Sequence, residues 1–132
     1  MIIKDVAIRR IIDSRGNPTV EADIKTSTGF GRAAAPAGAS TGTHEVVAWP
    51  DGKVSKGMEF AEKEVIPKLL GLSTDNQNEF DRLLKEIDGT ENFSVMGGNV
   101  SVAFSLACAK AAANSKGINL FEHISEKKPY SI

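Results

Sequence analysis

The chain has 132 residues, 41% hydrophobic and 25% charged, which is enough for one domain with its own core and excludes a disordered or fibrous chain. The formal net charge of -1, with no long run of like charge, gives no reason to expect nucleic acid or an anionic membrane as a partner. The single cysteine, Cys108, excludes a disulfide within the chain and favours a reducing, cytoplasmic compartment. The apolar start Met1-Ile2-Ile3 is too short for a signal peptide or a membrane span.

Three strands are predicted in the first 35 residues. Ile2 to Ile12 is rich in β-branched residues, and both Thr19 to Thr26 and Phe30 to Ala35 alternate between two faces. The turn-forming residues Asp13 to Pro18 separate the first two strands, and Ser27 to Gly29 separate the last two. We therefore expect an antiparallel meander of about three strands.

The alternation also predicts which side chains share a face. In the second strand, one face carries Val20, Ala22 and Ile24, and the other carries Glu21, Asp23 and Lys25. In the third strand, Phe30, Arg32 and Ala34 lie opposite Gly31, Ala33 and Ala35. A sheet of this kind buries one face and exposes the other.

The next part of the chain predicts a first helix, capped by Ser55 and running to about Leu70. Its apolar stripe consists of Met58, Ala61, Val65 and Leu69. Because proline removes a hydrogen-bond donor and crowds the preceding turn, Pro67 should distort the last turn, and Gly71 should end the helix.

Two longer helices and a short one should follow. Asp75 should cap a helix that ends at Gly89, and an alanine-rich helix from about Asn99 to Lys116 should be the central one, since its small side chains permit close packing. A short final helix is predicted around Leu120 to Ile124. Strands first and helices afterwards indicate an α+β fold in one domain, residues 1–132, with a bundle of about four helices on one face of the sheet.

The segment from Pro36 to Glu45 joins the strands to the helices and is rich in glycine and in polar groups. These residues are compatible with a functional loop and with an ordinary flexible connection. The run Gly38-Ala39-Ser40-Thr41-Gly42 matches the Gly-x-Ser-x-Gly pattern of hydrolases, but the alternating strands and helices of that fold are absent around it. His44 can be a proton carrier or simply a solvated loop histidine.

The number and type of polar residues limit which metal ions and which interface contacts the chain can provide. One cysteine and two separated histidines do not supply a zinc site. Magnesium is less demanding, because a single Ser hydroxyl on a loop can complete a shell built elsewhere. Arg9, Arg15 and Glu21 flank the first turn, where they can be solvated strand ends or can form ion pairs to a partner surface.

Several motifs occur together in one order and spacing that resembles the N-terminal domain of enolase. They are Asp13 to Glu21, Ala35 to Gly42 with His44-Glu45, Asp88 to Asn92, Gly97-Gly98-Asn99 and Ser105-Leu106-Ala107. The resemblance covers essentially the whole chain, and it implies a β-meander followed by a helical bundle. Departures from the family pattern occur at Ala37, at Trp49-Pro50-Asp51, at Phe93 and at Val95.

The resemblance implies reversible dehydration of 2-phosphoglycerate to phosphoenolpyruvate, with a Lys base, a Glu acid and two Mg²⁺ ions. In that family these groups belong largely to a C-terminal barrel, which is absent from this sequence, so we expect the isolated chain to be inactive. What the resemblance assigns to this chain is a lid over the substrate, in which Ser40 ligates the second Mg²⁺. The lid residues are Ala37, Gly38, Ala39, Ser40, Thr41, Gly42 and His44.

By the same resemblance, Arg9, Arg15 and Glu21 lie near a subunit interface or the contact with the barrel, and the complete protein is a homo-oligomer. Two alternatives remain open from the sequence. One is a stand-alone binding module with this fold, and the other is the N-terminal domain of a different enzyme of the enolase superfamily.

Overall fold

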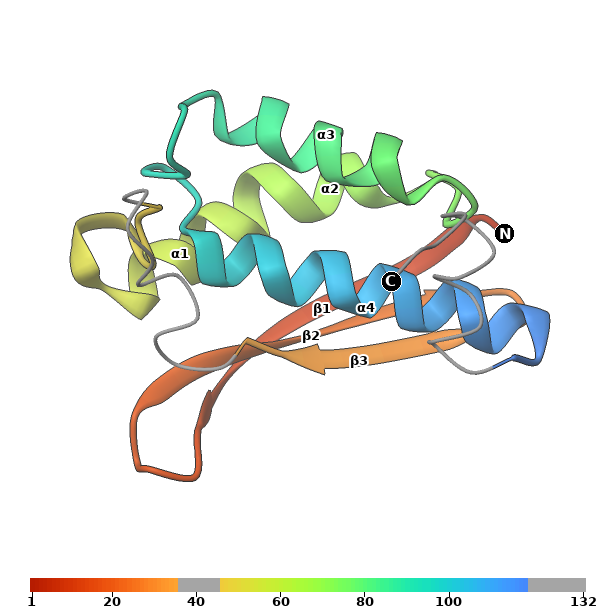
Figure 1. Cartoon of the computed structure of the whole chain (residues 1–132), viewed down its shortest axis with the longest axis horizontal. Coiled ribbons are helices and arrows are strands. Elements are labelled where there is room, and N and C mark those ends of the chain that lie inside the picture. The colour runs from red at the N-terminus through yellow and green to blue at the C-terminus, as the bar shows by residue number, and fades with distance from the viewer. Residues whose placement is uncertain (36–45, 119–132) are drawn as a thin grey trace, which may run out of the picture.

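A computed structural model describes residues 1–35 and 46–118 of the chain. The elements, in chain order, are β1 (Ile3–Ile12), β2 (Pro18–Thr26), β3 (Phe30–Ala34), the 3-10 turn η1 (Pro50–Gly52), α1 (Val54–Phe60), the π-helical segment η2 (Ala61–Val65), α2 (Ile66–Leu69), α3 (Gln77–Asp88) and α4 (Gly98–Lys116). Figure 1 shows the helices on one face of the sheet, with α4 next to the strands and α3 farther away. The predicted α+β fold is confirmed, whereas the predicted helix around Leu120 to Ile124 lies outside the described residues.

The sheet is an antiparallel meander in the order β1-β2-β3. Ala22 of β2 lies opposite Ile8 of β1 on one side and Ala33 of β3 on the other. The predicted alternation is confirmed, since Val20, Ala22 and Ile24 are fully buried beneath the helices. The charged residues between them therefore point to the outer face of the sheet.

Helix α4 packs against β2 and β3 so closely that its backbone contacts the backbone of β3. A Cβ atom placed on Gly31 would lie 2.0 Å from the carbonyl oxygen of Ala107 and 2.5 Å from the backbone nitrogen of Ala111. One on Gly29 would lie 2.1 Å from Oγ of Ser115. Glycine in β3 and alanine in α4 thus permit this approach, and the prediction that α4 is the central helix is confirmed by its burial on several sides.

The predicted single helix after Lys53 consists of three segments, α1, η2 and α2. The N-H of Ile66 donates to the carbonyl of Ala61, five residues back, which is a π-helical bond. The distortion therefore lies in the turn before Pro67 and not in the last turn, because the proline ring crowds the backbone that precedes it. No helix among residues 1–35 and 46–118 combines the length and apolar character needed to cross a bilayer.

Both predicted N-caps are wrong by one or two positions. Helix α1 begins at Val54 after Lys53, so Ser55 lies inside its first turn and does not cap it. Asp75 instead accepts a hydrogen bond from the amino group of Met1 at 2.9 Å, which leaves Asn76 to cap α3 through its Oδ1 and the N-H of Glu79. The cap of α3 thus lies one residue after the predicted position.

Candidate functional site

The structure shows how the chain reaches and leaves the segment 36–45. That segment, which includes all seven predicted lid residues and the predicted metal ligand Ser40, lies outside the described residues. We call Ala35 the leading stem and Val46–Ala48 the trailing stem. Their contacts define where the segment is attached to the domain.

The leading stem continues the sheet beyond the end of β3. Ala35 is fully buried, and its N-H donates to the carbonyl of Val20 at 3.0 Å. Its own carbonyl accepts a hydrogen bond from Oγ1 of Thr19 at 2.5 Å. Since both backbone groups of Ala35 are bonded to β2, the chain leaves the sheet at a defined point.

The trailing stem is bonded to the start of α4 and to the loop before it. The N-H of Val47 donates to the carbonyl of Asn92 at 2.8 Å, and the carbonyl of Val47 accepts from the N-H of Gly98 at 2.6 Å. The N-H of Asn99 donates to the carbonyl of Ala48 at 3.3 Å. The first amides of a helix have no partner within the helix, and Gly97 offers no side-chain cap, so the trailing stem caps α4.

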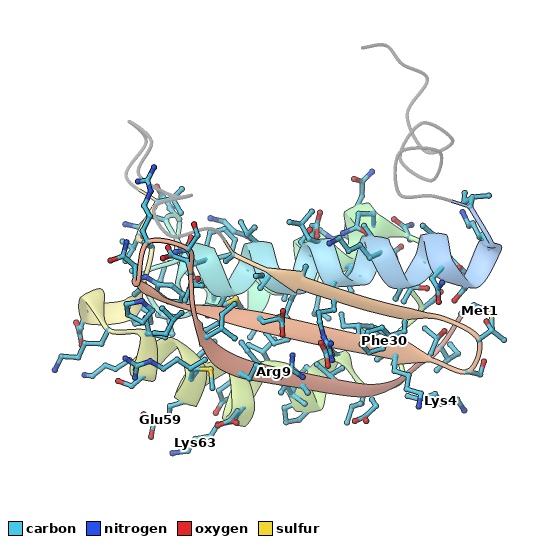
Figure 2. All side chains as sticks on the ribbon, turned by 90° about the horizontal axis from the view of Figure 1, so that it is seen from below. Met1, Lys4, Arg9, Phe30, Glu59 and Lys63 are labelled. Carbon is cyan, nitrogen blue, oxygen red and sulfur yellow. The ribbon has the colours of Figure 1, made fainter. Side chains whose placement is uncertain are left out.

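The outer face of the sheet carries a cluster of two arginines and two carboxylates. Arg9 of β1 donates to Glu21 at 2.7 Å and to Asp23 at 2.6 and 3.1 Å. Arg32 of β3 donates to the same Asp23 at 2.8 and 3.0 Å. Figure 2 looks onto this face, with Arg9 and Phe30 labelled along the sheet.

These contacts shift the ionisation of the cluster. Hydrogen bonds from Arg32 and then from Arg9 hold the pKa of Asp23 well below its usual value, against the opposing effect of burial. Hydrogen bonds to Asp23 and Glu21 raise the pKa of Arg9 above its usual value. The side chains of Asp23, Arg9 and Arg32 are therefore charged across the ordinary pH range.

Of the three predicted interface residues, the structure brings two together. Arg9 and Glu21 are cross-strand partners in the cluster, but Arg15 lies in the exposed turn between β1 and β2, where its backbone N-H donates to Asp13 at 2.9 Å. The sequence interpretation did not include Asp23 and Arg32. Their alternation was visible in the sequence, but the pairing of the strands that joins them was not.

The described residues do not form a metal site of their own. Residues 1–35 and 46–118 contain no group of three or more His, Cys, Asp or Glu side chains able to hold an ion. Cys108 is fully buried, and burial raises the pKa of its thiol to about 12. This thiol is therefore neither a reactive nucleophile nor a ready metal ligand.

Comparison with known proteins identifies the family. A family profile described as "Enolase, N-terminal domain" matches residues 3–124. The chain is 51% identical over 131 residues to the enolase of Methanosphaera stadtmanae. The aligned region covers 99% of this chain and 32% of that protein. It is 52% identical over 123 residues to the enolase of Methanothermobacter thermautotrophicus, with 93% and 30% of the two chains covered.

A more distant enolase, from Pyrococcus furiosus, is 47% identical over 135 residues and is covered to 31% of its length. The chain belongs to the enolase N-terminal domain family. It spans about a third of the length of the curated relatives that it matches.

Proposed function

We propose that the chain is the N-terminal domain of an enolase, a carbon-oxygen lyase that reversibly dehydrates 2-phosphoglycerate to phosphoenolpyruvate in glycolysis and gluconeogenesis. The observation that carries this proposal is the identity of 51% to one enolase over 99% of the chain. In this proposal the protein works in the cytoplasm, and the base, the acid and most metal ligands come from a C-terminal barrel domain. The isolated chain then has no turnover.

The chain contributes the cover of the active site in this proposal. Ser40 contacts one of two Mg²⁺ ions, Ala39 lies beside the substrate, and Gly38 and Gly42 act as hinges, with Ala37, Thr41 and His44 completing the loop. Bound Mg²⁺ supplies electrostatic stabilisation of negative charge on the substrate. Support comes from the family match through this segment and from the two stems, which hold its ends on the domain by hydrogen bonds. In this proposal the other metal ligands come from the barrel, and residues 1–35 and 46–118 hold no group of three or more His, Cys, Asp or Glu side chains able to bind an ion.

We also propose that the outer face of the sheet contacts a second subunit or the barrel, through Arg9, Arg15 and Glu21. The exposed side chain of Phe30, 42% accessible, lies on the same face as the charged cluster and adds apolar area to it. Support for Arg9 and Glu21 is their position on an uncovered sheet face. Arg15 extends from the turn at the end of the same two strands.

The test is a chimera in which this chain replaces the matching N-terminal part of the Methanosphaera stadtmanae enolase. The chimera should dehydrate 2-phosphoglycerate in the presence of Mg²⁺. Ser40→Ala should lower kcat/KM by about 100-fold, because a misplaced cover loses the positioning of the substrate. Ser55→Ala, at an exposed position of α1, is the control and should keep the activity of the chimera.

Two results would contradict the proposal. A folded chimera with no dehydration activity would favour a stand-alone binding module. Turnover of 2-phosphoglycerate by the isolated 132-residue chain would show that the catalytic groups are in this domain.

A further inference from the structure

We infer that Asp88 is a positioning residue for the trailing stem, through the loop that its carboxylate holds together. We call residues 88–97 the Asp88 loop. The coupling between this loop and the trailing stem rests on contacts in the structure. Any consequence for catalysis rests, in addition, on the function proposed above.

The carboxylate of Asp88 accepts four hydrogen bonds from its own loop. One oxygen accepts from the N-H groups of Val95 at 3.0 Å and of Met96 at 2.7 Å. The other accepts from the N-H of Thr90 at 2.9 Å and from the Thr90 hydroxyl. Asp88 is only 5% exposed, so removing the carboxylate would leave several donors without a partner in a site that admits little water.

The Asp88 loop needs these bonds because part of its backbone is strained. Phe93 has a φ of 59°, in the left-handed region that a bulky side chain seldom adopts. The turn is closed by the N-H of Gly97, which donates to the carbonyl of Phe93 at 2.8 Å. Lys85 of α3 packs on this turn. Its Nζ lies 4.7 Å from the centre of the Phe93 ring and donates a hydrogen bond to the carbonyl of Glu91 at 2.5 Å. Such a conformation persists only while the surrounding contacts enforce it.

The strained loop touches the trailing stem at two points. The carbonyl of Asn92, next to Phe93, accepts the N-H of Val47 at 2.8 Å. At the other end of the loop, a Cβ on Gly97 would lie 2.7 Å from the carbonyl oxygen of Ala48, so the two backbones are in contact. The conformation of the Asp88 loop, which Asp88 enforces, thus helps to position the trailing stem, together with the bonds from Gly98 and Asn99 of α4.

Amide hydrogen exchange on the 132-residue chain tests the coupling. Thr90→Val keeps the shape of the side chain but removes its donor to Asp88 and the acceptor for the N-H of Ser94. Thr26→Val is the control, because the hydroxyl of Thr26 also accepts a backbone hydrogen bond, but at the turn between β2 and β3; Thr26 is buried, whereas Thr90 is partly buried. Asp88→Asn provides a second, independent variant of the loop.

We expect Thr90→Val and Asp88→Asn to speed exchange of the Val47 and Gly98 amides by about tenfold or more relative to the amides of β2, since a lost hydrogen bond to a charged group shifts local opening by that factor. Thr26→Val, at the last residue of β2, should not speed exchange of the Val47 and Gly98 amides more than exchange of the β2 amides. The inference is overturned if Val47 keeps its protection, or loses it only in step with β2, in the two loop variants.

A kinetic measurement on the chimera separates this inference from the proposed function. Thr90→Val should raise KM for 2-phosphoglycerate by a factor of about 3 to 10, because a less ordered stem must be fixed when substrate binds, whereas Thr26→Val should not. Equal KM values for Thr90→Val and Thr26→Val would show that the Asp88 loop has no effect on substrate binding. If the unmodified chimera is inactive, the proposed function fails, and the exchange rates alone decide the role of Asp88.

Discussion

Arg9 and Asp23 join the first two strands by two parallel hydrogen bonds, from Nη2 to Oδ2 at 2.6 Å and from Nη1 to Oδ1 at 3.1 Å. Arg32 approaches the same carboxylate from the third strand. Asp23 therefore bonds to both neighbouring strands at once. Its side chain is 14% exposed, which shields the arrangement from much of the surrounding water.

Asp23→Asn should lower the free energy of unfolding by about 1–2 kcal/mol at neutral pH, because it removes charge-assisted hydrogen bonds and leaves two guanidinium groups facing each other. Urea unfolding of the chain measures this change. The control is Glu59→Gln, which breaks the exposed pair with Lys63 on the helical side of the molecule (Figure 2) and should have little effect. Equal losses in the two variants would contradict the central role of Asp23.

The same carboxylate predicts a pH dependence. Its pKa in the folded state lies below the value of 3.8 that it has in an unfolded chain. The unfolded state therefore binds the proton first as the pH falls, so the stability contributed by Asp23 is complete above about pH 4 and declines progressively as the pH falls further towards the folded-state pKa. The free energy of unfolding, measured with urea, should fall less between about pH 7 and about pH 3 in Asp23→Asn than in the unmodified chain. An unchanged difference would contradict the prediction.

Gly31→Ala should destabilise the chain by about 3 kcal/mol or more, because the added methyl group would meet the backbone of α4, which cannot rotate away. Urea unfolding is again the measurement. Ala34→Ser adds one atom on the exposed face of the same strand and should be nearly neutral. A stable Gly31→Ala variant would show that α4 can move away from the sheet at low cost.

Gly97→Ala should cost more than Gly71→Ala, although both residues have positive φ, 92° and 87°. The backbone cost of about 1 kcal/mol is common to both. Nothing lies within 4 Å of a Cβ on Gly71, whereas one on Gly97 meets the trailing stem, which should add about 1–3 kcal/mol. Equal unfolding free energies of the Gly97→Ala and Gly71→Ala variants would mean that the trailing stem can move away from residue 97 at no cost in stability.

Cys108 should react with thiol reagents only when the chain unfolds. The thiol is fully buried, and its raised pKa of about 12 keeps it protonated at neutral and mildly alkaline pH. It is the only cysteine in the sequence, so the labelling rate reports on one site. The rate should rise with urea in parallel with unfolding, and fast labelling of the folded chain would contradict the burial of α4.

Much of the fold could be predicted from local pattern. The two-residue period of Val20, Ala22 and Ile24 identified the buried face of β2, because any other orientation would expose three apolar side chains. The small residues of α4 indicated a central helix for a similar reason. These features depend on neighbours within a single element.

The remaining features depend on partners far away in the sequence. The charge cluster depends on the pairing of three strands, and the trailing stem depends on Asn92 and Gly98. The motif from Asp88 to Asn92 was visible as a family resemblance, but no local rule indicates that its carboxylate would hold Val95 and Met96. For the candidate site, the resemblance indicated the segment 36–45, and the structure adds how its ends are attached.

The close approach of β3 to α4 limits how this domain can change during evolution. A substitution at Gly31 that adds atoms requires the helix to move, and a moved α4 would also lose its bonds to Val47 and Ala48. A substitution in the sheet would thus affect the attachment of the segment 36–45 through α4. That attachment lies at the opposite end of the helix from Ser115, which contacts Thr26. Position 31 should therefore remain glycine in related proteins that keep this distance between β3 and the backbone of α4.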